Sequence, residues 1–251
     1  YCAEIGIEFM STPFDFESVD VLNELDVKRF KIASGDITHS PLLEYVASKG
    51  KPIILSTGAS TIEEIQEAVD FIKNAGCSDL TLLHCVSLYP TPAANANLYV
   101  ISLFKSKFDL PVGFSDHTQG YHIPIAAIAK GATVIEKHFT IDKSLPGPDQ
   151  KLSADPDEFR KIVEYGKEVY EAIKVEGKVI SEEESKMIPV MRRSIVASRN
   201  LKAGRKINPD DLDYKRPGKG ISPRNYRYII GKKLKCAVKK DEMIKTSDIK
   251  T

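Results

Sequence analysis

Residues 7 to 173 alternate between short apolar runs, rich in β-branched and aromatic residues, and longer amphipathic stretches. The short runs, which we expect to form strands, are 7–11, 29–33, 52–56, 80–85, 111–115 and 133–139. Between them the apolar residues recur at helical spacing, and Gly50, Gly76 and Gly131 stand where a left-handed residue ends a helix. Strands joined by helices lie parallel, because each connection must cross back over the sheet. The pattern therefore predicts an α/β fold with a parallel sheet.

Polar side chains stand at or just beyond the carboxyl end of each of these runs. They are Thr12, Ser34, Ser56, Thr57, Ser87, Ser115, Asp116, His117, Lys137 and His138. A (β/α)8 TIM barrel gathers such groups from all of its strands at one face, whereas a doubly wound sheet concentrates them at one switch point. We therefore predict a TIM barrel. A barrel of this class has eight strands and the sequence shows six, so the first two strands are expected to be missing from this chain.

The domain organisation follows from the composition. Residues 1–175 are expected to form the partial TIM-barrel domain, residues 176–190 a polar linker, and residues 191–251 a small β-rich domain. Residues 191–251 hold 18 Lys and Arg against 6 Asp and Glu, a net charge of +12, whereas residues 1–190 hold 18 against 29, a net charge of −11. A basic domain can bind nucleic acid, an acidic partner or an anionic substrate, or can simply be solvated. Since no recognised nucleic-acid motif accompanies the charge, we predict no nucleic-acid partner.

Neither a membrane span nor an export signal is expected. No run approaches the roughly 18 apolar residues that a membrane helix needs, and the first residues lack the pattern of a signal peptide. The four cysteines, at positions 2, 77, 85 and 236, are scattered without the paired spacing of a metal site. This usage suits a reducing compartment, so we expect no membrane partner and a cytoplasmic location.

The segment KIASGDI places Lys31, Ser34 and Asp36 at one strand end and in the loop that follows it. A lysine at a barrel mouth can bind a phosphate or carboxylate, a serine can donate to the same anion, and a carboxylate can transfer protons. The alternative is a surface salt bridge. Residues 56–61 place small side chains before a helix, where exposed N–H groups can bind an anion or can merely be capped.

His117 and His138 lie 21 residues apart at the ends of consecutive predicted strands. Neighbouring strands lie about 4.8 Å apart, so both imidazoles can reach one metal ion. Two histidines with open coordination positions suit Mn²⁺, Fe²⁺, Co²⁺ or Zn²⁺ better than Mg²⁺. Asp116 or a substrate oxygen could supply further ligands. The alternative is a pair of hydrogen-bonded structural histidines.

Eight stretches in order, FMSTPF, KIASGDI, PIILSTG, LLHCVSLYPTP, GFSDHT, EKHFT, PGPD and KRPGKG, resemble the sialic acid synthase family. The C-terminal domain resembles the antifreeze-like SAF domain that follows the barrel in this family. The resemblance implies a phosphoenolpyruvate-dependent transferase. Such an enzyme joins phosphoenolpyruvate to an N-acylmannosamine-type sugar by C–O cleavage, giving a sialic acid and phosphate. The alternatives are a synthase for legionaminate, pseudaminate or a spore-coat sugar acid, and an inactive carbohydrate-binding fragment.

The resemblance also implies roles for individual residues. His117 and His138 match the metal ligands of the family, which hold Mn²⁺, with Mg²⁺ or Co²⁺ as alternatives. The positions that match phosphoenolpyruvate-binding residues are Thr12, Lys31, Ser34, Ser87 and Ser115, and those near the sugar are Tyr89 and Asp149.

At two positions the chain departs from the residues of the family, and a third position bears on the assembly of its subunits. Ser87 stands where some relatives have Asn, and Asp36 stands where the family has a catalytic Glu. Arg216 matches an arginine that the SAF domain of one subunit inserts into the barrel of its partner. The resemblance therefore implies a homodimer with exchanged C-terminal domains.

Overall fold

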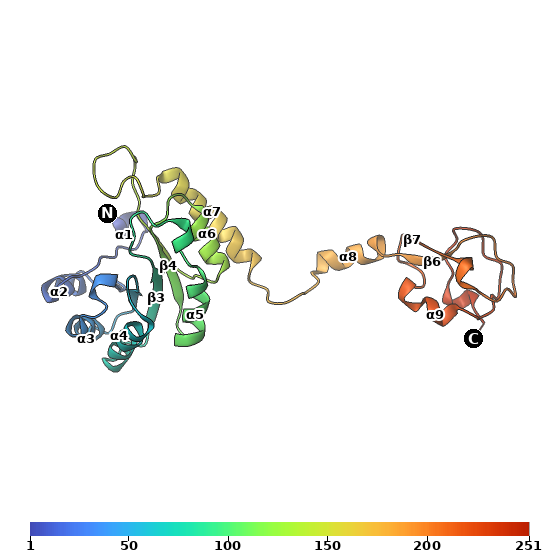
Figure 1. Cartoon of the computed structure of the whole chain (residues 1–251), viewed down its shortest axis with the longest axis horizontal. Coiled ribbons are helices and arrows are strands. Elements are labelled where there is room, and N and C mark those ends of the chain that lie inside the picture. The colour runs from blue at the N-terminus through green and yellow to red at the C-terminus, as the bar shows by residue number, and fades with distance from the viewer. Residues whose placement is uncertain (251) are drawn as a thin grey trace. The chain divides into compact units, whose positions relative to one another are not determined.

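The computed structural model of the chain describes residues 1–250 and divides into two compact units, residues 1–175 and the residues from 176 onward. The first unit contains one parallel sheet, whose strands pair in chain order (Figure 1). The strands are β1 (Phe30–Ile32), β2 (Ile53–Ser56), β3 (Leu80–Cys85), β4 (Val112–Asp116) and β5 (Ile135–Lys137). Each falls within, or extends by one residue, a run that the sequence predicts to be a strand. The prediction of a parallel α/β sheet is confirmed.

The predicted strand at residues 7–11 is wrong. This segment forms no ladder with a neighbouring strand, and Glu8 makes an ion pair at 2.7 Å with Arg29, the residue just before β1. Ile7 and Phe9 are 59% and 50% exposed. A strand is stable when a partner binds its backbone and one face is buried. The local sequence has strand propensity, but in residues 7–11 no neighbouring strand binds the backbone and the apolar side chains of Ile7 and Phe9 are not buried.

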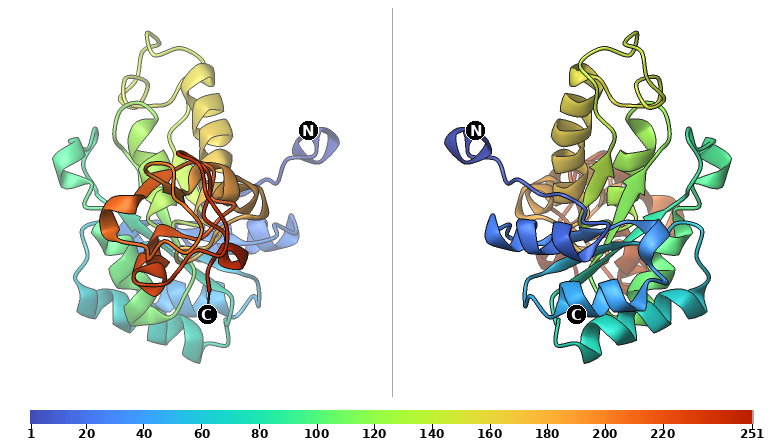
Figure 2. Two further views of the ribbon diagram at one scale, coloured as in Figure 1. Left: turned by 90° about the vertical axis from the view of Figure 1, so that its right-hand side faces the viewer. Right: turned by 90° about the vertical axis from the view of Figure 1, so that its left-hand side faces the viewer.

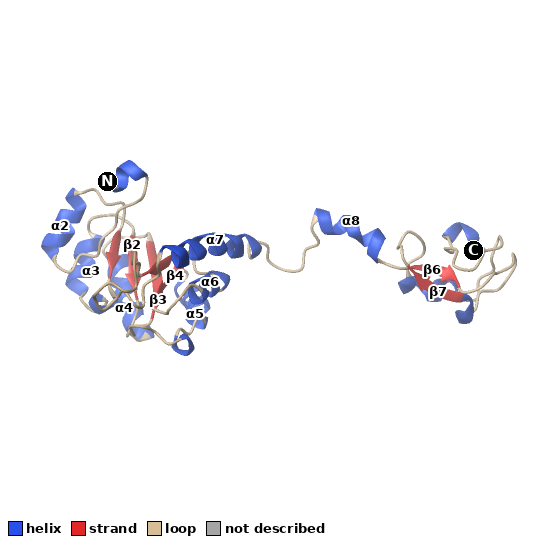
Figure 3. Cartoon of the chain, turned by 90° about the horizontal axis from the view of Figure 1, so that it is seen from above, coloured by secondary structure: helices blue, strands red, loops and turns tan. Residues whose placement is uncertain are grey.

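The helices that contribute to the core pack on one face of the sheet (Figures 2 and 3). Two helices of the first unit precede β1, four connect successive strands and one follows β5. They are α1 (Cys2–Ile5), α2 (Phe16–Glu24), α3 (Ser40–Ala47), α4 (Ile62–Asn74), α5 (Tyr99–Phe108), α6 (His122–Ala129) and α7 (Pro156–Ala172). A capping box at Thr61 begins α4, because the Thr61 hydroxyl accepts from the Glu64 N–H at 3.2 Å and the Glu64 carboxylate accepts from the Thr61 N–H at 2.7 Å.

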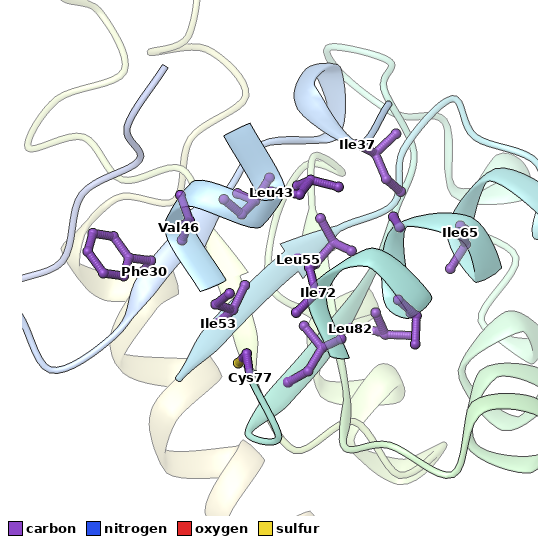
Figure 4. Close-up of a cluster of buried hydrophobic side chains, with 14 of the residues drawn as sticks. Phe30, Ile37, Leu43, Val46, Ile53, Leu55, Ile65, Ile72, Cys77 and Leu82 are labelled. Atoms are coloured by element: carbon purple, nitrogen blue, oxygen red, sulfur yellow. The ribbon is translucent and has the colours of Figure 1, made fainter. Parts of the chain in front are cut away.

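The core of this unit lies between the helices and the convex face of the sheet. Figure 4 shows Val46 of α3 and Ile72 of α4 in the cluster that also contains Phe30, Ile53 and Leu55 of the strands. All five side chains are at most 1% exposed. Because side chains alternate along a strand, the residues between these strand positions face the opposite, concave side.

Several polar side chains of the strands lie on the concave face. The ladder pairs Lys31 with Ile54, Cys85 with Ser115, and Ser115 with Glu136, so their side chains share this face. Lys31 belongs to the first strand and Glu136 to the last, yet the Lys31 ammonium lies 3.3 Å from the Glu136 carboxylate. Such an approach requires the sheet to curl. The first unit is therefore a half-barrel of five strands.

The second unit is small and rich in loops. Its elements are α8 (Glu182–Met191), the antiparallel strands β6 (Ser194–Ala197) and β7 (Leu212–Lys215), and α9 (Tyr226–Ile229). The buried carboxylate of Asp211 accepts hydrogen bonds from the guanidinium groups of Arg199 and Arg205, at 2.7–3.1 Å. Part of the high basic charge of this segment is thus used inside its own fold. The prediction of a small β-rich domain is confirmed.

The predicted linker contains a helix. Residues 182–191 are helical, because the Ser181 hydroxyl accepts from the Glu184 N–H at 3.0 Å and three glutamates occupy the first turn. An N-cap serine and acidic residues at the positive end of the dipole both stabilise a helix. None of the helices in the part of the chain that the structure describes is long and apolar enough to cross a membrane.

Candidate active site

Lys31, the middle residue of β1, has its side chain on the concave face. Its side chain is 8% exposed, and its ammonium lies 3.3 Å from Glu136 Oε2. The other oxygen of Glu136 accepts a hydrogen bond from the Ser115 hydroxyl at 2.6 Å. A buried lysine of this kind does not fit the alternative of a surface salt bridge. The arrangement puts one cation, one carboxylate and one hydroxyl in direct contact, which suits binding of an anion and transfer of protons.

The loop after β2 forms a second polar group beside this centre. The N–H of Gly58 donates to the Ser34 hydroxyl at 2.8 Å. Ser34, Gly58 and Ser87 line a hollow of about 300 Å³. A Cβ on Gly58 would lie 2.4 Å from Ser87 Oγ, 3.0 Å from Ser34 Oγ and 3.1 Å from Cys85 Sγ. Glycine is therefore needed at position 58 because the two hydroxyls approach the backbone closely.

Ser56, the last residue of β2, shows that the concave face has unused hydrogen-bonding capacity. Its hydroxyl is buried and has no hydrogen-bond partner within residues 1–250. Buried polar groups without partners are uncommon in native folds because the lost hydration is not replaced. A ligand oxygen at the concave face would supply the partner. The sequence places Ser56 at a strand end, and its register with Leu83 on β3 gives the face on which it lies.

The two imidazoles meet beyond the ends of β4 and β5. The ring centroids of His117 and His138 are 5.3 Å apart. His117 Nδ1 lies 2.8 Å from the carbonyl oxygen of Val86, which can only accept, so Nδ1 carries the proton and Nε2 keeps its lone pair. Burial lowers the pKa of His117, which favours the neutral ring. A neutral imidazole with a fixed tautomer fits the requirements of a metal ligand.

Two further predicted residues lie against the imidazoles. The ring of Tyr89 is 4.1 Å from the ring of His117 and 5.8 Å from the ring of His138, between centroids. Burial raises the pKa of Tyr89, so its hydroxyl remains protonated at neutral pH. His138 Nδ1 lies 3.8 Å from the Asp149 carboxylate. The residues expected near the sugar thus surround the residues expected to bind the metal.

Asp116 is not available as a third ligand, contrary to one expectation from the sequence. One carboxylate oxygen lies 2.7 Å from the Lys137 ammonium and the other accepts from the Thr118 N–H at 2.9 Å. Asp116 follows Ser115 in the alternation, so it faces the convex side. Within residues 1–250 no group of three or more His, Cys, Asp and Glu side chains could hold a metal. The protein would supply two imidazoles, and water or substrate the remaining ligands.

Two predicted residues of the first unit, Thr12 and Asp36, are not brought into contact with this centre. Thr12 is half-buried in the extended stretch before α2, and Asp36 ends the 3₁₀ turn Ser34–Asp36. Over the described residues 1–250, the Asp36 carboxylate has no hydrogen bond or ion pair with another candidate. Arg216 belongs to the second unit, where it is exposed just after β7. Together with Arg193, Tyr214 and Lys215, it lines a polar hollow of about 580 Å³.

Sequence reasoning missed Glu136, which contacts both Lys31 and Ser115. The position of Glu136 in the sequence could have indicated that it belongs to the site. Glu136 lies two residues before His138 within a predicted strand, so alternation puts both side chains on one face. A carboxylate in the interior of an apolar strand is unusual unless it is paired or functional.

Sequence models of known protein families match both units of the chain. The sequence model of the NeuB family matches residues 1–178. The chain belongs to the NeuB family. The sequence model of the SAF domain matches residues 192–250, so the second unit of this NeuB-family chain is a SAF domain. The two matches together cover both units.

Individual relatives of this NeuB-family chain cover nearly all of it. An uncharacterized protein of Methanocaldococcus jannaschii is 49% identical over 99% of this chain and 74% of its own length. The N,N'-diacetyllegionaminic acid synthase of Campylobacter jejuni is 43% identical over 98% of this chain and 74% of its own length. The pseudaminic acid synthase of the same organism is 36% identical over 97% of this chain and 71% of its own length.

A solved structure is similar as well. The N-acetylneuraminic acid (sialic acid) synthetase of Leptospira borgpetersenii superposes with a TM-score of 0.71 at 39% identity, over 74% of this chain and 65% of that chain. Members of this family are therefore named as synthases of several different nonulosonic acids. The predicted family and its enzymatic character are confirmed. The identity of the sugar substrate belongs to the proposal below, because these relatives are named for different products.

Proposed function

We propose that the concave face of the half-barrel binds phosphoenolpyruvate and joins it to an N-acylated hexosamine, giving a nonulosonic acid and phosphate. The observation that carries the proposal is the contact of Lys31 with Glu136 on the same face as the paired imidazoles. A buried cation suits the anionic substrate. A neighbouring pair of imidazoles suits a divalent cation beside the sugar carbonyl.

The condensation balances without an oxidant or a further co-reactant. C3 of phosphoenolpyruvate attacks the aldehyde carbon of the open-chain sugar, and the aldehyde oxygen gains a proton to become a hydroxyl. One water adds to C2 and loses a proton. The tetrahedral intermediate then expels phosphate by cleavage of its C–O bond, which leaves the keto group of the product.

The described residues divide these tasks. Lys31 and the hydroxyls of Ser34, Ser56 and Ser115 would hold the phosphate and carboxylate of phosphoenolpyruvate through charge-assisted hydrogen bonds. Glu136 would move protons, because it lies within contact distance of Lys31 and Ser115, which Asp36 does not.

The same proposal assigns the metal and the sugar. His117 and His138 would bind a divalent cation, with Mn²⁺ preferred over Mg²⁺ by the imidazole donors. When bound, the cation would act as a Lewis acid on the sugar aldehyde. Tyr89 and Asp149, which lie against the two rings, would contact the sugar.

The acceptor that we propose is an N-acylmannosamine-type sugar. Relatives named for legionaminic and pseudaminic acid synthesis make diacetamido sugars the competing acceptors. The full-length gene product would be incubated with Mn²⁺, each sugar in turn and phosphoenolpyruvate that carries ¹⁸O in its bridging C–O bond. We expect one sugar to give the nonulosonic acid, with ¹⁸O in the released phosphate. Unlabelled phosphate, or no product with any of these sugars, would contradict the proposal.

A homodimer in which Arg216 serves the partner's barrel is the second part of this proposal, and it rests on the family resemblance. Arg216→Ala and His138→Ala subunits, each inactive alone, would be mixed and exchanged. If Arg216 acts in the partner, each mixed dimer has one intact site and one site with both defects, so part of the activity returns. No recovery in dimers shown to be mixed would refute the exchanged arrangement.

A cytoplasmic location likewise stays a prediction, to be tested by fractionation of cells that produce the protein.

A further inference from the structure

Asp116 and Lys137 form a buried ion pair directly behind the two imidazoles. They are register partners at the last rung of the β4–β5 ladder, and the carboxylate Oδ2 lies 2.7 Å from the ammonium Nζ. Their side chains are 0% and 1% exposed. Each immediately precedes one of the imidazoles, His117 and His138. By strand alternation the ion pair occupies the helix-covered face, whereas the imidazoles occupy the concave face.

The ion pair also holds the backbone on the far side of His117. The second carboxylate oxygen of Asp116 accepts from the Thr118 N–H at 2.9 Å, and the Lys137 ammonium donates to the Thr118 carbonyl. The residues before and after His117 are therefore both tied to the residue that precedes His138. The carbonyl of His117 is held too, because it accepts from the N–H of Thr91 at 2.8 Å.

We propose that Asp116 and Lys137 are positioning residues that fix the separation of the two imidazoles for a divalent cation. This inference rests on the metal site proposed above. Neither side chain faces the concave side, so the pair acts through the backbone of His117 and His138 rather than as ligands. Imidazole nitrogens bind such ions at about 2 Å, and a small shift between the ends of β4 and β5 would move one ring out of range.

If the ion pair between Asp116 and Lys137 only stabilised the fold, its removal would change the stability of the protein but not its affinity for Mn²⁺. A variant that keeps the stability can separate this role from the positioning role. Removing one partner of a buried ion pair leaves an uncompensated charge, whereas replacing both by apolar side chains of similar size is often neutral or stabilising for the fold. The double variant Asp116→Leu/Lys137→Met therefore removes the tie between the strand ends. It leaves the net charge unchanged, so long-range attraction of the cation is also unchanged.

The experiment measures binding of Mn²⁺ alone, from the electron paramagnetic resonance signal of the free ion, and thermal unfolding of the same samples. We expect the double variant to unfold at a temperature close to that of the unaltered chain and to bind Mn²⁺ about 10- to 100-fold more weakly. The matched control is Asp20→Leu/Lys49→Met, which removes a 2.6 Å ion pair between α2 and a residue that follows the end of α3, and should leave Mn²⁺ affinity unchanged.

The outcomes distinguish the two proposals. A folded double variant that binds Mn²⁺ as tightly as the unaltered chain would overturn the positioning role and leave the metal site standing. Absence of Mn²⁺ binding by the unaltered chain would overturn both. If the double variant does not fold, Asp116→Asn is the test, because it is nearly isosteric and keeps an acceptor for the Thr118 N–H. Unchanged affinity in a folded Asp116→Asn variant would equally overturn the positioning role.

Discussion

Lys31 and Glu136 lie on the first and last strands of a five-stranded sheet, and their charged groups are 3.3 Å apart. Three strands separate them in the ladder, at about 4.8 Å per step, so a flat sheet would hold them far apart. The contact is possible because the sheet curls into a half-barrel. It also brings side chains more than 100 residues apart in the sequence into one polar centre.

The first prediction concerns anion binding by Lys31. Replacement by Met keeps the length of the apolar stem but removes the ammonium, and with it one charge-assisted hydrogen bond to the substrate. Such bonds contribute about 1.5–3 kcal/mol, so Lys31→Met should weaken phosphoenolpyruvate binding roughly 10- to 150-fold. Isothermal titration calorimetry with phosphoenolpyruvate is the measurement. Lys51→Met, which breaks the exposed ion pair with Asp26, is the control and should bind normally.

The second prediction concerns the metal. His117→Ala and His138→Ala should each weaken Mn²⁺ binding by more than the 10- to 100-fold typical of losing an outer partner of a metal ligand. His39→Ala, outside the imidazole pair, should have no effect. Chelation should abolish turnover of the full-length gene product, and added Mn²⁺ should restore it. Full activity in chelator with both imidazoles replaced would exclude a metal role for them.

The third prediction concerns stability against pH. Burial lowers the pKa of both His84 and His117 from the ordinary value of 6.5. The unfolded chain therefore binds more protons than the folded chain between that value and the folded pKa values. Linkage then requires the stability of the first unit to be fully present above pH 6.5 and to fall as the pH is lowered from there.

Chemical unfolding followed by circular dichroism on both sides of that pH checks the sign. The variant His84→Gln/His117→Gln should lose less stability on acidification than the unaltered chain. Equal losses in the two proteins would show that these imidazoles do not cause the effect.

The fourth prediction concerns the close approach at Gly58. An added methyl group would meet Ser87 Oγ at 2.4 Å and Ser34 Oγ at 3.0 Å, so Gly58→Ala should displace both hydroxyls. We expect a loss of about 1–3 kcal/mol in the free energy of unfolding, together with weaker phosphoenolpyruvate binding. Gly35→Ala is the matched control, since no atom lies within 4 Å of its added Cβ. Equal behaviour of the two variants would contradict the crowding argument.

Much of the first unit could be predicted from the sequence because its information is local. Strand alternation and helix ends follow from short-range patterns, and the Thr61–Glu64 capping box is visible as two residues three apart. The proximity of His117 and His138 also follows, because they end consecutive strands of a parallel sheet.

The remaining features depend on contacts that no local pattern carries. Residues 7–11 have strand propensity, but a ladder needs a neighbour that the sequence does not reveal. The pairing of Lys31 with Glu136 depends on the curl of the sheet as a whole. The side of the sheet on which Asp116 lies, by contrast, could have been inferred locally, because strand alternation puts it opposite its neighbours Ser115 and His117.

Paramagnetic relaxation of the ³¹P resonance of phosphoenolpyruvate by Mn²⁺ tests most directly whether one concave face binds both ligands. The unaltered chain should enhance this relaxation well beyond the effect of Mn²⁺ on free phosphoenolpyruvate. The enhancement should disappear both in Lys31→Met and in His117→Ala/His138→Ala, because the first loses the anion and the second loses the cation. Enhancement that persists in either variant, or its absence from the unaltered chain, would contradict a shared site at the carboxyl ends of β1 to β5.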